Sequence, residues 1–197
     1  MIEPLRSKYQ IKVSLQGWSP PIWRRLSVPS NITLDKLHLV IQHAMGWENC
    51  HLHHFKHGGL TYERSEDYVD LSNDGFGEYN SRDESKYKLS QILKHEKEHM
   101  FYEYDFGDSW AHRVLLEKIL PYDLGSKEVQ CIAGKRACPP EDCGGLYGYQ
   151  NLLSQISDTS HSEHKYAVEW LGECFDYQFF DIESTNKLLK RCIKQYT

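Results

Sequence analysis

Apolar and polar residues alternate in the first 30 positions of the chain. Ile11, Val13 and Leu15 occupy every second position of residues 9–16, and residues 22–28 form a second run after the break GWSPP. Alternation at period two places one set of side chains on one face of a β-strand. The two runs therefore predict two strands, the second of which begins beside a proline pair.

The next segment has the spacing of an α-helix. Apolar residues recur every three or four positions, at Leu34, Leu37, Val40, Ile41 and Ala44. Asn31 or Thr33 is suited to cap the start of this helix, and Gly46 to end it.

Two hairpins follow in the pattern. The first lies in residues 51–63 and turns at Gly58-Gly59, and the second joins residues 100–106 to residues 109–119 through Gly107-Asp108. Glycine and aspartate are typical of such turns.

The segments between and after the hairpins are polar or helical. Residues 63–86 are polar and acidic, which favours a loop or mobile insertion, and a short helix is expected near residues 89–95. Three helical patterns then occupy residues 148–156, 161–173 and 181–196.

Strands first and helices later are typical of an α+β fold. We expect a single domain with a mostly antiparallel sheet and helices packed on one face. It spans residues 8–185, and residues 186–197 add a C-terminal helix that completes it. The expected core consists of Ile11, Val13, Leu37, Val40, Ile41, Phe55, Tyr104, Phe106, Val114 and Leu152.

Charge narrows the range of partners. The net charge is −5, with seven Lys/Arg and three Asp/Glu in residues 1–60, and nine acidic residues against one lysine in residues 138–185. An acidic total argues against strong nonspecific nucleic-acid binding, which depends on phosphate neutralisation, although the basic first third leaves a local patch open.

The chain shows no feature of a membrane or secreted protein. No apolar run reaches the length of roughly 20 residues that a membrane helix needs, and the N-terminus lacks an apolar signal region. We expect a cytoplasmic protein without a membrane partner, whose six cysteines are reduced.

The segment YEYDFGDSWAHRV places Asp105, Asp108, Trp110 and His112 within eight positions. One interpretation is a metal or general-base site. The other is a structural hairpin in which the carboxylates accept backbone N–H bonds of their own turn. We favour the second, because three ligands from one hairpin seldom complete a metal site.

Three further segments resemble metal motifs. HEKEH (residues 95–99) matches the zinc-peptidase pattern but is charged on all sides, so we interpret it as a solvated helix end. HLHHFKH (residues 51–57) fits a strand with hydrated histidines. Cys131, Cys138 and Cys143 lack the usual zinc spacing. No metal site is assigned and no cofactor is required, although a divalent metal stays open.

The segment CPPEDCGGLYGYQNLL (residues 138–153) combines prolines, adjacent carboxylates and glycines. A glycine-rich run before a helix is able to bind phosphate, but Glu141 and Asp142 would repel an anion. We therefore interpret it as a rigid turn in which the glycines permit close backbone approach.

Five motifs together resemble one family. They are PPIWRRLSVP, TLDKLHLVIQHAMGW, HLHHF, YDFGDSWAHRV and CIAGKRACPPEDCGGLYGYQNLL, and they extend over roughly residues 8–185. They resemble the Ri-plasmid (pRiA-type) ORF-three-like domain family, whose members often carry the label of an insertion-element passenger protein, TnpR or transposon resolvase. The resemblance implies a single α+β domain and a mobile-element association, but no known activity.

Resolvase activity does not fit the residues. A serine recombinase needs an N-terminal nucleophilic serine with several supporting arginines, and Ser7 has only Arg6 nearby. A tyrosine recombinase needs an Arg-His-Arg set before a late tyrosine, which Arg136, Arg191 and Tyr196 do not convincingly supply.

The sequence is compatible with two functions, one catalytic and one not, so it does not decide whether the protein is an enzyme. The first, which we favour, is a non-catalytic binding module for a peptide, a nucleic acid or a small ligand. The second is a metal-dependent hydrolase that acts on phosphodiesters. The candidate ligand-binding residues are Trp23, Arg24, Arg25, Trp47, His51, Asp105, Asp108, Trp110, His112, Glu141 and Asp142.

The two functions differ in the partners of the carboxylates. In a structural hairpin, Arg24-Arg25 and Lys135-Arg136 are the expected partners of Asp105, Asp108 and the Glu141-Asp142 pair. In a hydrolase the carboxylates converge instead in a cleft.

Overall fold

The alternating segments form one eight-stranded sheet. This computed structural model describes residues 7–65, 80–122, 129–173 and 175–195. The strand order is β5-β4-β3-β6-β7-β1-β2-β8, and neighbouring strands are antiparallel except β4 and β5. The bounds are β1 Ser7–Leu15, β2 Trp23–Pro29, β3 His53–His57, β4 Leu60–Glu63, β5 Ser81–Asp83, β6 His99–Tyr104, β7 Trp110–Pro121 and β8 Gln130–Lys135.

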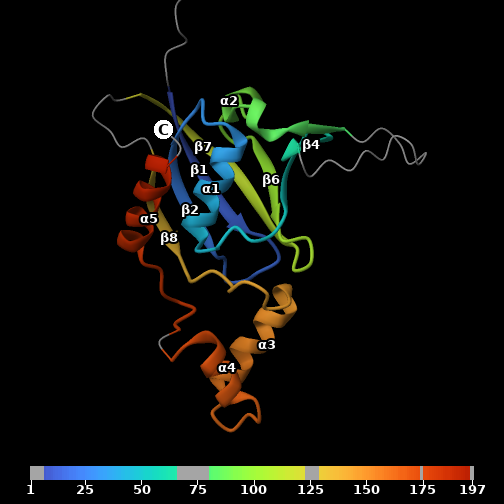
Figure 1. Ribbon diagram of the computed structural model, residues 1–197. Helices are drawn as coiled ribbons and strands as arrows, with labels where there is room; N and C mark the ends of the chain where they lie inside the picture. Colours follow the sequence, from blue (N-terminus) through green and yellow to red (C-terminus); the bar gives the residue numbers. More distant parts are fainter. Residues whose placement is uncertain (1–6, 66–79, 123–128, 174, 196–197) are drawn as a thin grey trace, which may run out of the picture.

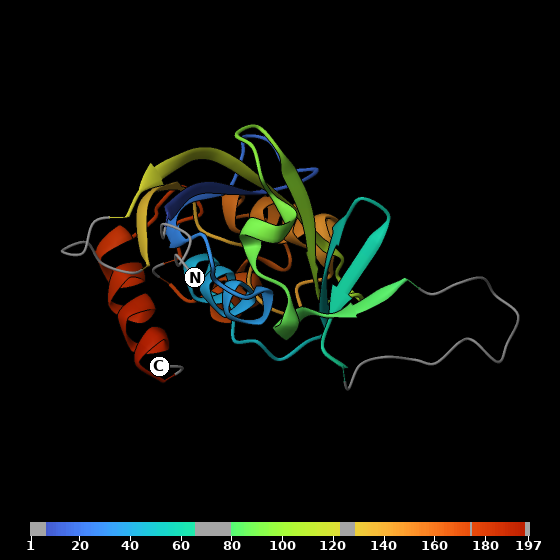
Figure 2. The ribbon, with the colours of Figure 1, turned by 90° about the horizontal axis from the view of Figure 1, so that it is seen from above.

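Helices cover the concave side of this sheet. Figure 2 shows the strands curving around α1, with α5 beside α1 and β8. Figure 1 shows α3 and α4 beyond one end of the sheet. The bounds are α1 Leu34–Met45, α2 Leu89–Ile92, α3 Gly145–Ser157, α4 His164–Leu171 and α5 Ile182–Gln195. The prediction of a single α+β domain with a mostly antiparallel sheet is confirmed.

Helix α1 forms where its apolar spacing predicts it. All five of its predicted apolar positions are buried against the sheet. Thr33 occupies the N-cap position, and Gly46 ends the helix with a φ of 106°. A left-handed C-cap of this kind favours glycine, because glycine carries no Cβ.

The predicted core is correct except at two positions. Phe106 is 46% exposed, and Leu152 is only partly buried, whereas the other eight residues are buried. Strand β6 ends at Tyr104, and Asp105 adopts a φ of 57°. This change of direction breaks the alternation, so Phe106 leaves the core face and packs against His54, with ring centroids 4.9 Å apart.

The edge strand β8 was not predicted, because CIAGK alternates poorly and its pairing with β2 contains a bulge. Helix α5 completes this edge. The amide of Asn186 bonds both the N–H and the C=O of Cys131, at 2.9 Å each. This pairing supports the proposal that the C-terminal helix is part of the same domain.

The HEKEH segment is not a helix. Residues 95–98 form a turn between α2 and β6, in which the Glu98 carboxylate accepts the N–H groups of Lys94 and His95. His95 and His99 therefore do not share a helical face as the zinc-peptidase pattern requires. The expected helix end is wrong, since α2 already ends at Ile92.

Most of the acidic insertion lies outside the described residues, namely residues 66–79. On its C-terminal side, Ser81–Asp83 pairs with β4, and Glu84–Lys86 forms a 3-10 turn capped by Asp83. Of the helices in the described part of the chain, none is long and apolar enough to cross a membrane.

Candidate metal centre

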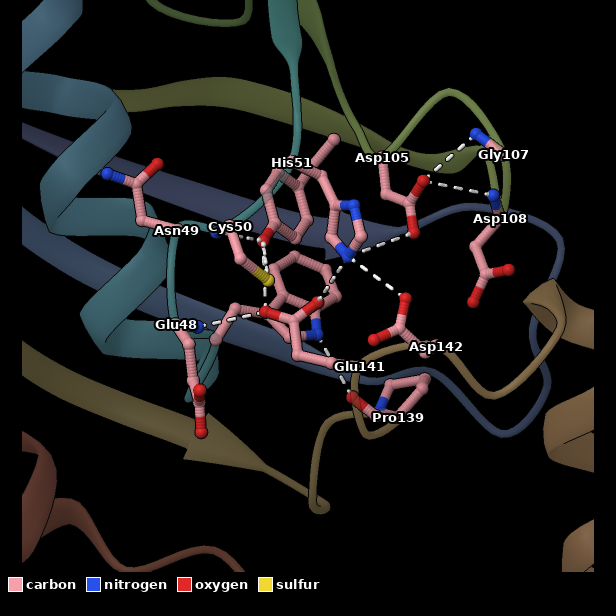
Figure 3. A network of polar contacts seen from close by, with 12 residues as sticks. Glu48, Asn49, Cys50, His51, Asp105, Gly107, Asp108, Pro139, Glu141 and Asp142 are labelled. Carbon is pink, nitrogen blue, oxygen red and sulfur yellow. Dashed lines mark hydrogen bonds and ion pairs between the residues drawn. The ribbon is translucent and has the colours of Figure 1, made fainter.

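Three chain segments that are far apart in sequence meet at one end of the sheet. His51 lies between α1 and β3, Asp105 follows β6, and Glu141 and Asp142 lie between β8 and α3. Figure 3 shows these four side chains pointing toward one another. We refer to His51, Asp105, Glu141 and Asp142 as the carboxylate–histidine cluster.

His51 stands at the centre of the cluster. Its Nε2 lies 3.1 Å from Asp142 Oδ1, 3.7 Å from Asp105 Oδ2 and 3.8 Å from Glu141 Oε2. Three carboxylate oxygens thus surround one imidazole nitrogen (Figure 3), and the donor atoms form two groups that share His51, one with Asp105 and Asp142 and the other with Cys50 and Glu141.

Asp105 divides its two oxygens between the backbone and the cluster. Oδ1 accepts the N–H of Gly107 at 2.9 Å and the N–H of Asp108 at 3.3 Å. These bonds confirm the predicted turn chemistry. They also fix the carboxylate so that Oδ2 faces His51, and the side chain is 9% exposed.

Glu141 is held in the same manner. Its Oε1 accepts the backbone N–H of Glu48 and the hydroxyl of Tyr104, both at 2.9 Å. Its Oε2 faces His51 instead. Each of these two carboxylates therefore uses one oxygen for structure and directs the other into the cluster.

Two atoms of the cluster are buried and form no hydrogen bond of good geometry among the described residues, namely Nε2 of His51, whose only polar neighbours in the cluster are the three carboxylates, and Oε2 of Glu141. Buried polar atoms are nearly always bonded to protein, water or an ion, because losing hydration without a partner costs free energy. Both atoms point to the same place, so a shared ligand there would satisfy them.

The spacing of the donor atoms fits a metal ion. Ligands about 2.0–2.2 Å from one tetrahedral ion lie roughly 3.4 Å from each other. The distances from His51 Nε2 to the three carboxylate oxygens, 3.1–3.8 Å, bracket that value. The donor atoms of His51, Asp105 and Asp142 all lie within 4.8 Å of one another.

A second set of donor atoms overlaps the first. The Sγ of Cys50 lies within 4.8 Å of the donor atoms of His51 and Glu141. Cys50 also donates its N–H to the Tyr104 hydroxyl at 3.1 Å. Neither Cys50 nor Tyr104 was among the predicted ligand-binding residues, although each is adjacent in sequence to one that was.

The backbone is strained in all three segments. Asn49, Asp105 and Asp142 have φ values of 58°, 57° and 54°. Non-glycine residues rarely adopt this region, and such strain concentrates at functional sites. Asparagine and aspartate adopt this region more readily than other non-glycine residues, and two of the three, Asp105 and Asp142, belong to the cluster.

Aromatic side chains form the base of the site. Trp47 is buried and donates its indole N–H to the carbonyl of Pro139 at 3.0 Å. Its ring packs against Tyr104 at 5.0 Å. Trp47 therefore anchors the segment that carries Glu141 and Asp142, and its predicted role as a direct ligand-binding residue stays a prediction.

Asp108 connects two turns and lies beside the cluster. Its Oδ2 accepts the N–H of Gly144 at 3.1 Å. A Cβ at Gly145, whose φ is 67°, would lie 2.7 Å from the carbonyl oxygen of Asp108. This contact is the close backbone approach that the glycine-rich run predicted.

Two other candidates lie in the core. Trp110 and His112 are fully buried on the inner face of β7, where the His112 ring lies 5.1 Å from that of Trp47. Burial lowers the pKa of His112 to about 4, so its imidazole is neutral at pH 7. These positions make His112 part of the packing beneath the cluster.

The predicted pairing of Arg24 with the carboxylates is wrong. Arg24 is 1% exposed and donates to the carbonyls of Ala44, Trp23 and Lys135 at 2.8–3.1 Å. Its guanidinium also lies 3.9 Å from the centre of the Phe180 ring. Alternation along β2 directs this side chain inward, away from the cluster.

Arg25 and Trp23 lie on the opposite face of β2. Arg25 forms a salt bridge of 2.6 Å with Glu117, not with Asp105 or Asp108. Of the second predicted pair, Lys135-Arg136, the Arg136 side chain donates to the carbonyl of Pro21 at 3.1 Å.

The three spaced cysteines do not form a group with the spacing of metal ligands among the described residues. Burial raises the pKa of Cys131 to about 11 and that of Cys143 to about 12, and it raises the pKa of Cys138 further. Burial therefore favours the neutral thiol form of all three side chains in the metal-free protein. These cysteines belong to the packing around α3 and β8.

Comparison with known proteins shows the family. The model of the plasmid pRiA4b ORF-3-like protein matches residues 7–184. Uncharacterized protein y4hQ of Sinorhizobium fredii (strain NBRC 101917 / NGR234) is 34% identical over 166 residues, which cover 84% of this chain and 81% of that protein. The crystal structure of a protein of unknown function, MM3350 from Methanosarcina mazei Go1, is similar with a TM-score of 0.79 and 38% identity. The matched region covers 91% of this chain and 98% of the Methanosarcina mazei chain.

Proposed function

This chain belongs to the plasmid pRiA4b ORF-3-like family, and we propose that it is a binding module whose ligand is a divalent metal ion held by the carboxylate–histidine cluster. The observation that carries the proposal is the convergence of three carboxylate oxygens on His51 Nε2 at 3.1–3.8 Å. The partners expected for a purely structural hairpin, Arg24 and Arg25, are engaged elsewhere.

The cluster carries charge that needs compensation. Three carboxylates approach one imidazole, and like charges so close together repel each other in a partly buried site. A divalent cation compensates for this repulsion. The bonds that fix one oxygen each of Asp105 and Glu141 keep the arrangement in place, as outer-shell contacts do in metal sites.

The donor set favours a transition metal. Carboxylate oxygens alone suit magnesium, calcium or manganese, whereas an imidazole nitrogen suits zinc, iron or nickel. One imidazole with several carboxylates, and a thiol nearby at Cys50, therefore points to zinc, manganese or iron(II).

The proposal is tested by calorimetric titration of the chelator-stripped protein with Zn²⁺ and Mn²⁺. We expect one ion bound per chain and a higher melting temperature. His51→Ala, Asp105→Asn and Glu141→Gln should each weaken the binding at least about tenfold, because each removes a ligand.

A matched control is His54→Ala. His54 is also a histidine beside a carboxylate, with Nε2 at 3.1 Å from Glu103, but it lies outside the cluster. This variant should bind the metal as the parent protein does. Binding that persists undiminished in His51→Ala would contradict the proposal.

One observation favours a second candidate function, a metal-dependent hydrolase. The Asp142 side chain is 72% exposed, so the cluster opens to solvent on one side. A catalytic metal needs such an open position for water. However, the arginines expected to orient a phosphodiester are engaged by carbonyls and by Glu117.

The second function is tested with the metal-loaded protein and bis(p-nitrophenyl) phosphate. Hydrolysis that needs the metal and disappears in His51→Ala would support it. Stoichiometric metal binding without hydrolysis would leave the binding module as the function.

A further inference from the structure

The convex face of the sheet carries a row of residues that are cationic or aromatic except for one serine. Six adjacent strands, β3, β6, β7, β1, β2 and β8, each contribute one residue to this row. Each residue lies directly opposite the next across the strand pair, so all six side chains share one face. In spatial order the row is Lys56, Phe101, Arg113, Ser14, Trp23 and Lys135. Since strands lie about 4.8 Å apart, the row is roughly 24 Å long.

A second row runs beside the first, two residues away along each strand. In the same registers it contains His99, Leu115, Lys12, Arg25 and Ala133. Neither row contains an acidic residue. The flanking acid Glu117 pairs with Arg25, and Glu103 lies 3.1 Å from His54.

This face is open in the described part of the chain. Figure 2 shows α1 and α5 on the concave side, whereas no helix covers the convex side of β6, β7 and β1. Phe101 is 47% exposed there. Lys56, His57, His99 and Phe101 line a hollow of about 600 Å³ at one end of the row.

The aromatic and cationic groups are interleaved. The Nζ of Lys12 lies 4.9 Å from the centre of the Trp23 ring, and Arg25 Cζ lies 5.1 Å from it. Nη2 of Arg113 lies 3.4 Å from Nδ1 of His99, whose ring packs edge-on against Phe101. Flat rings flanked by cations are the groups that bind an unpaired base and its phosphate together.

We propose that this convex face binds single-stranded nucleic acid. Phe101 and Trp23 stack with bases, and Lys12, Lys56, Arg113 and Lys135 neutralise phosphates. The net charge of −5 does not oppose this, because the acidic excess lies in residues 63–86 and 138–185 and not on the two rows. The inference is independent of the metal proposal, since no residue of the rows belongs to the carboxylate–histidine cluster.

The test is fluorescence anisotropy with labelled single-stranded DNA and RNA of about 15 nucleotides. With about four phosphate contacts, the logarithm of the affinity should fall against the logarithm of the salt concentration with a slope of about −3. The triple variant Lys12→Ala, Lys56→Ala, Arg113→Ala should bind at least about tenfold more weakly and show a shallower slope.

The matched control removes three cations from α5. Lys187, Lys190 and Arg191 are exposed on that helix, so their replacement by alanine changes the net charge equally but leaves the convex face intact. This control should bind nearly as tightly as the parent protein. Equal weakening in both triple variants would overturn the proposal, because it would show that overall charge alone decides the binding.

The aromatic contribution is tested separately. Phe101→Ala should weaken binding several-fold without changing the salt slope, whereas Tyr147→Ala, which removes an 86% exposed aromatic side chain on α3, should not. Thermal melts verify that each variant is folded. If poly-glutamate competes as well as the oligonucleotide, or if no oligonucleotide binds, the face is not a nucleic-acid site.

Discussion

The hydroxyl of Tyr104 donates a hydrogen bond of 2.9 Å to Oε1 of Glu141, which lies 37 residues further along the chain. The bond joins the end of β6 to the loop before α3. It also sets the direction of the second oxygen of Glu141, which faces His51.

Tyr104→Phe should therefore weaken metal binding without removing a ligand. We expect an affinity loss of about 10–100-fold, as for other contacts that orient a ligand. Calorimetry measures the effect. Tyr9→Phe is the matched control, since it removes a buried hydroxyl bond of 3.0 Å to Leu93 that lies away from the cluster. It should cost about 1 kcal/mol of stability and leave the affinity unchanged.

Asp105→Asn should not destabilise the metal-free protein. The amide oxygen still accepts the N–H of Gly107, and the substitution removes one of three carboxylates that repel each other. Denaturant melts with and without metal measure this, and the stabilisation by metal should be lost. A loss of about 1–3 kcal/mol without metal would instead indicate a structural carboxylate.

A structural carboxylate elsewhere provides the comparison. Asp181 accepts the N–H groups of Glu183 and Ser184 at the start of α5. Asp181→Ala should lose about 0.5–2 kcal/mol, the usual effect of removing a helix cap. It should retain the full stabilisation by metal.

His112 should make the protein less stable as the pH falls. Its pKa is about 4 in the folded protein because of burial, and near 6.5 when unfolded. Between these values the unfolded chain binds a proton that the folded chain does not, so stability is full above about pH 6.5 and decreases toward pH 4.

His112→Leu removes this dependence. Between pH 6.5 and pH 4, its stability should fall less steeply than that of the parent protein, by up to about 1.4 kcal/mol per pH unit. Parallel denaturant melts across this range measure the difference. Identical slopes would show that His112 is protonated within the folded protein.

Gly148→Ala should disrupt the turn before α3. A Cβ at this position would overlap the carbonyl of Cys143, which follows Asp142 directly. We expect a stability loss of about 1–3 kcal/mol and weaker metal binding. Asn151→Ala, at an exposed position of the same helix, should change neither the stability nor the metal affinity. Wild-type stability in Gly148→Ala would show that this backbone contact is dispensable.

The sequence predicted the strands and helices whose burial pattern is regular. Alternation in β1 and β2, and the three- and four-residue spacing in α1, follow directly from which side chains are buried. Strand β8 was not predicted because its alternation is irregular. The backbone N–H and C=O of its Cys131 bond the side chain of Asn186, 55 residues away, which a local pattern does not reveal.

The cluster itself was only partly predictable. His51, Asp105, Glu141 and Asp142 were all candidates, but the separation of up to 91 residues between them hides their convergence from local patterns. Arg24 shows the opposite case. Alternation along β2 already directs Arg24 inward with Leu26, and Arg25 outward, so the two arginines were never able to act as a pair.

The measurement that tests the account most directly is X-ray absorption of the metal-loaded protein, with the metal content determined on the same sample. We predict one ion per chain, bound by one imidazole nitrogen and carboxylate oxygens at about 2.0–2.2 Å. An ion bound mainly by sulfur at about 2.3 Å, or no stoichiometric ion after loading, would contradict the assignment of the carboxylate–histidine cluster as a metal centre.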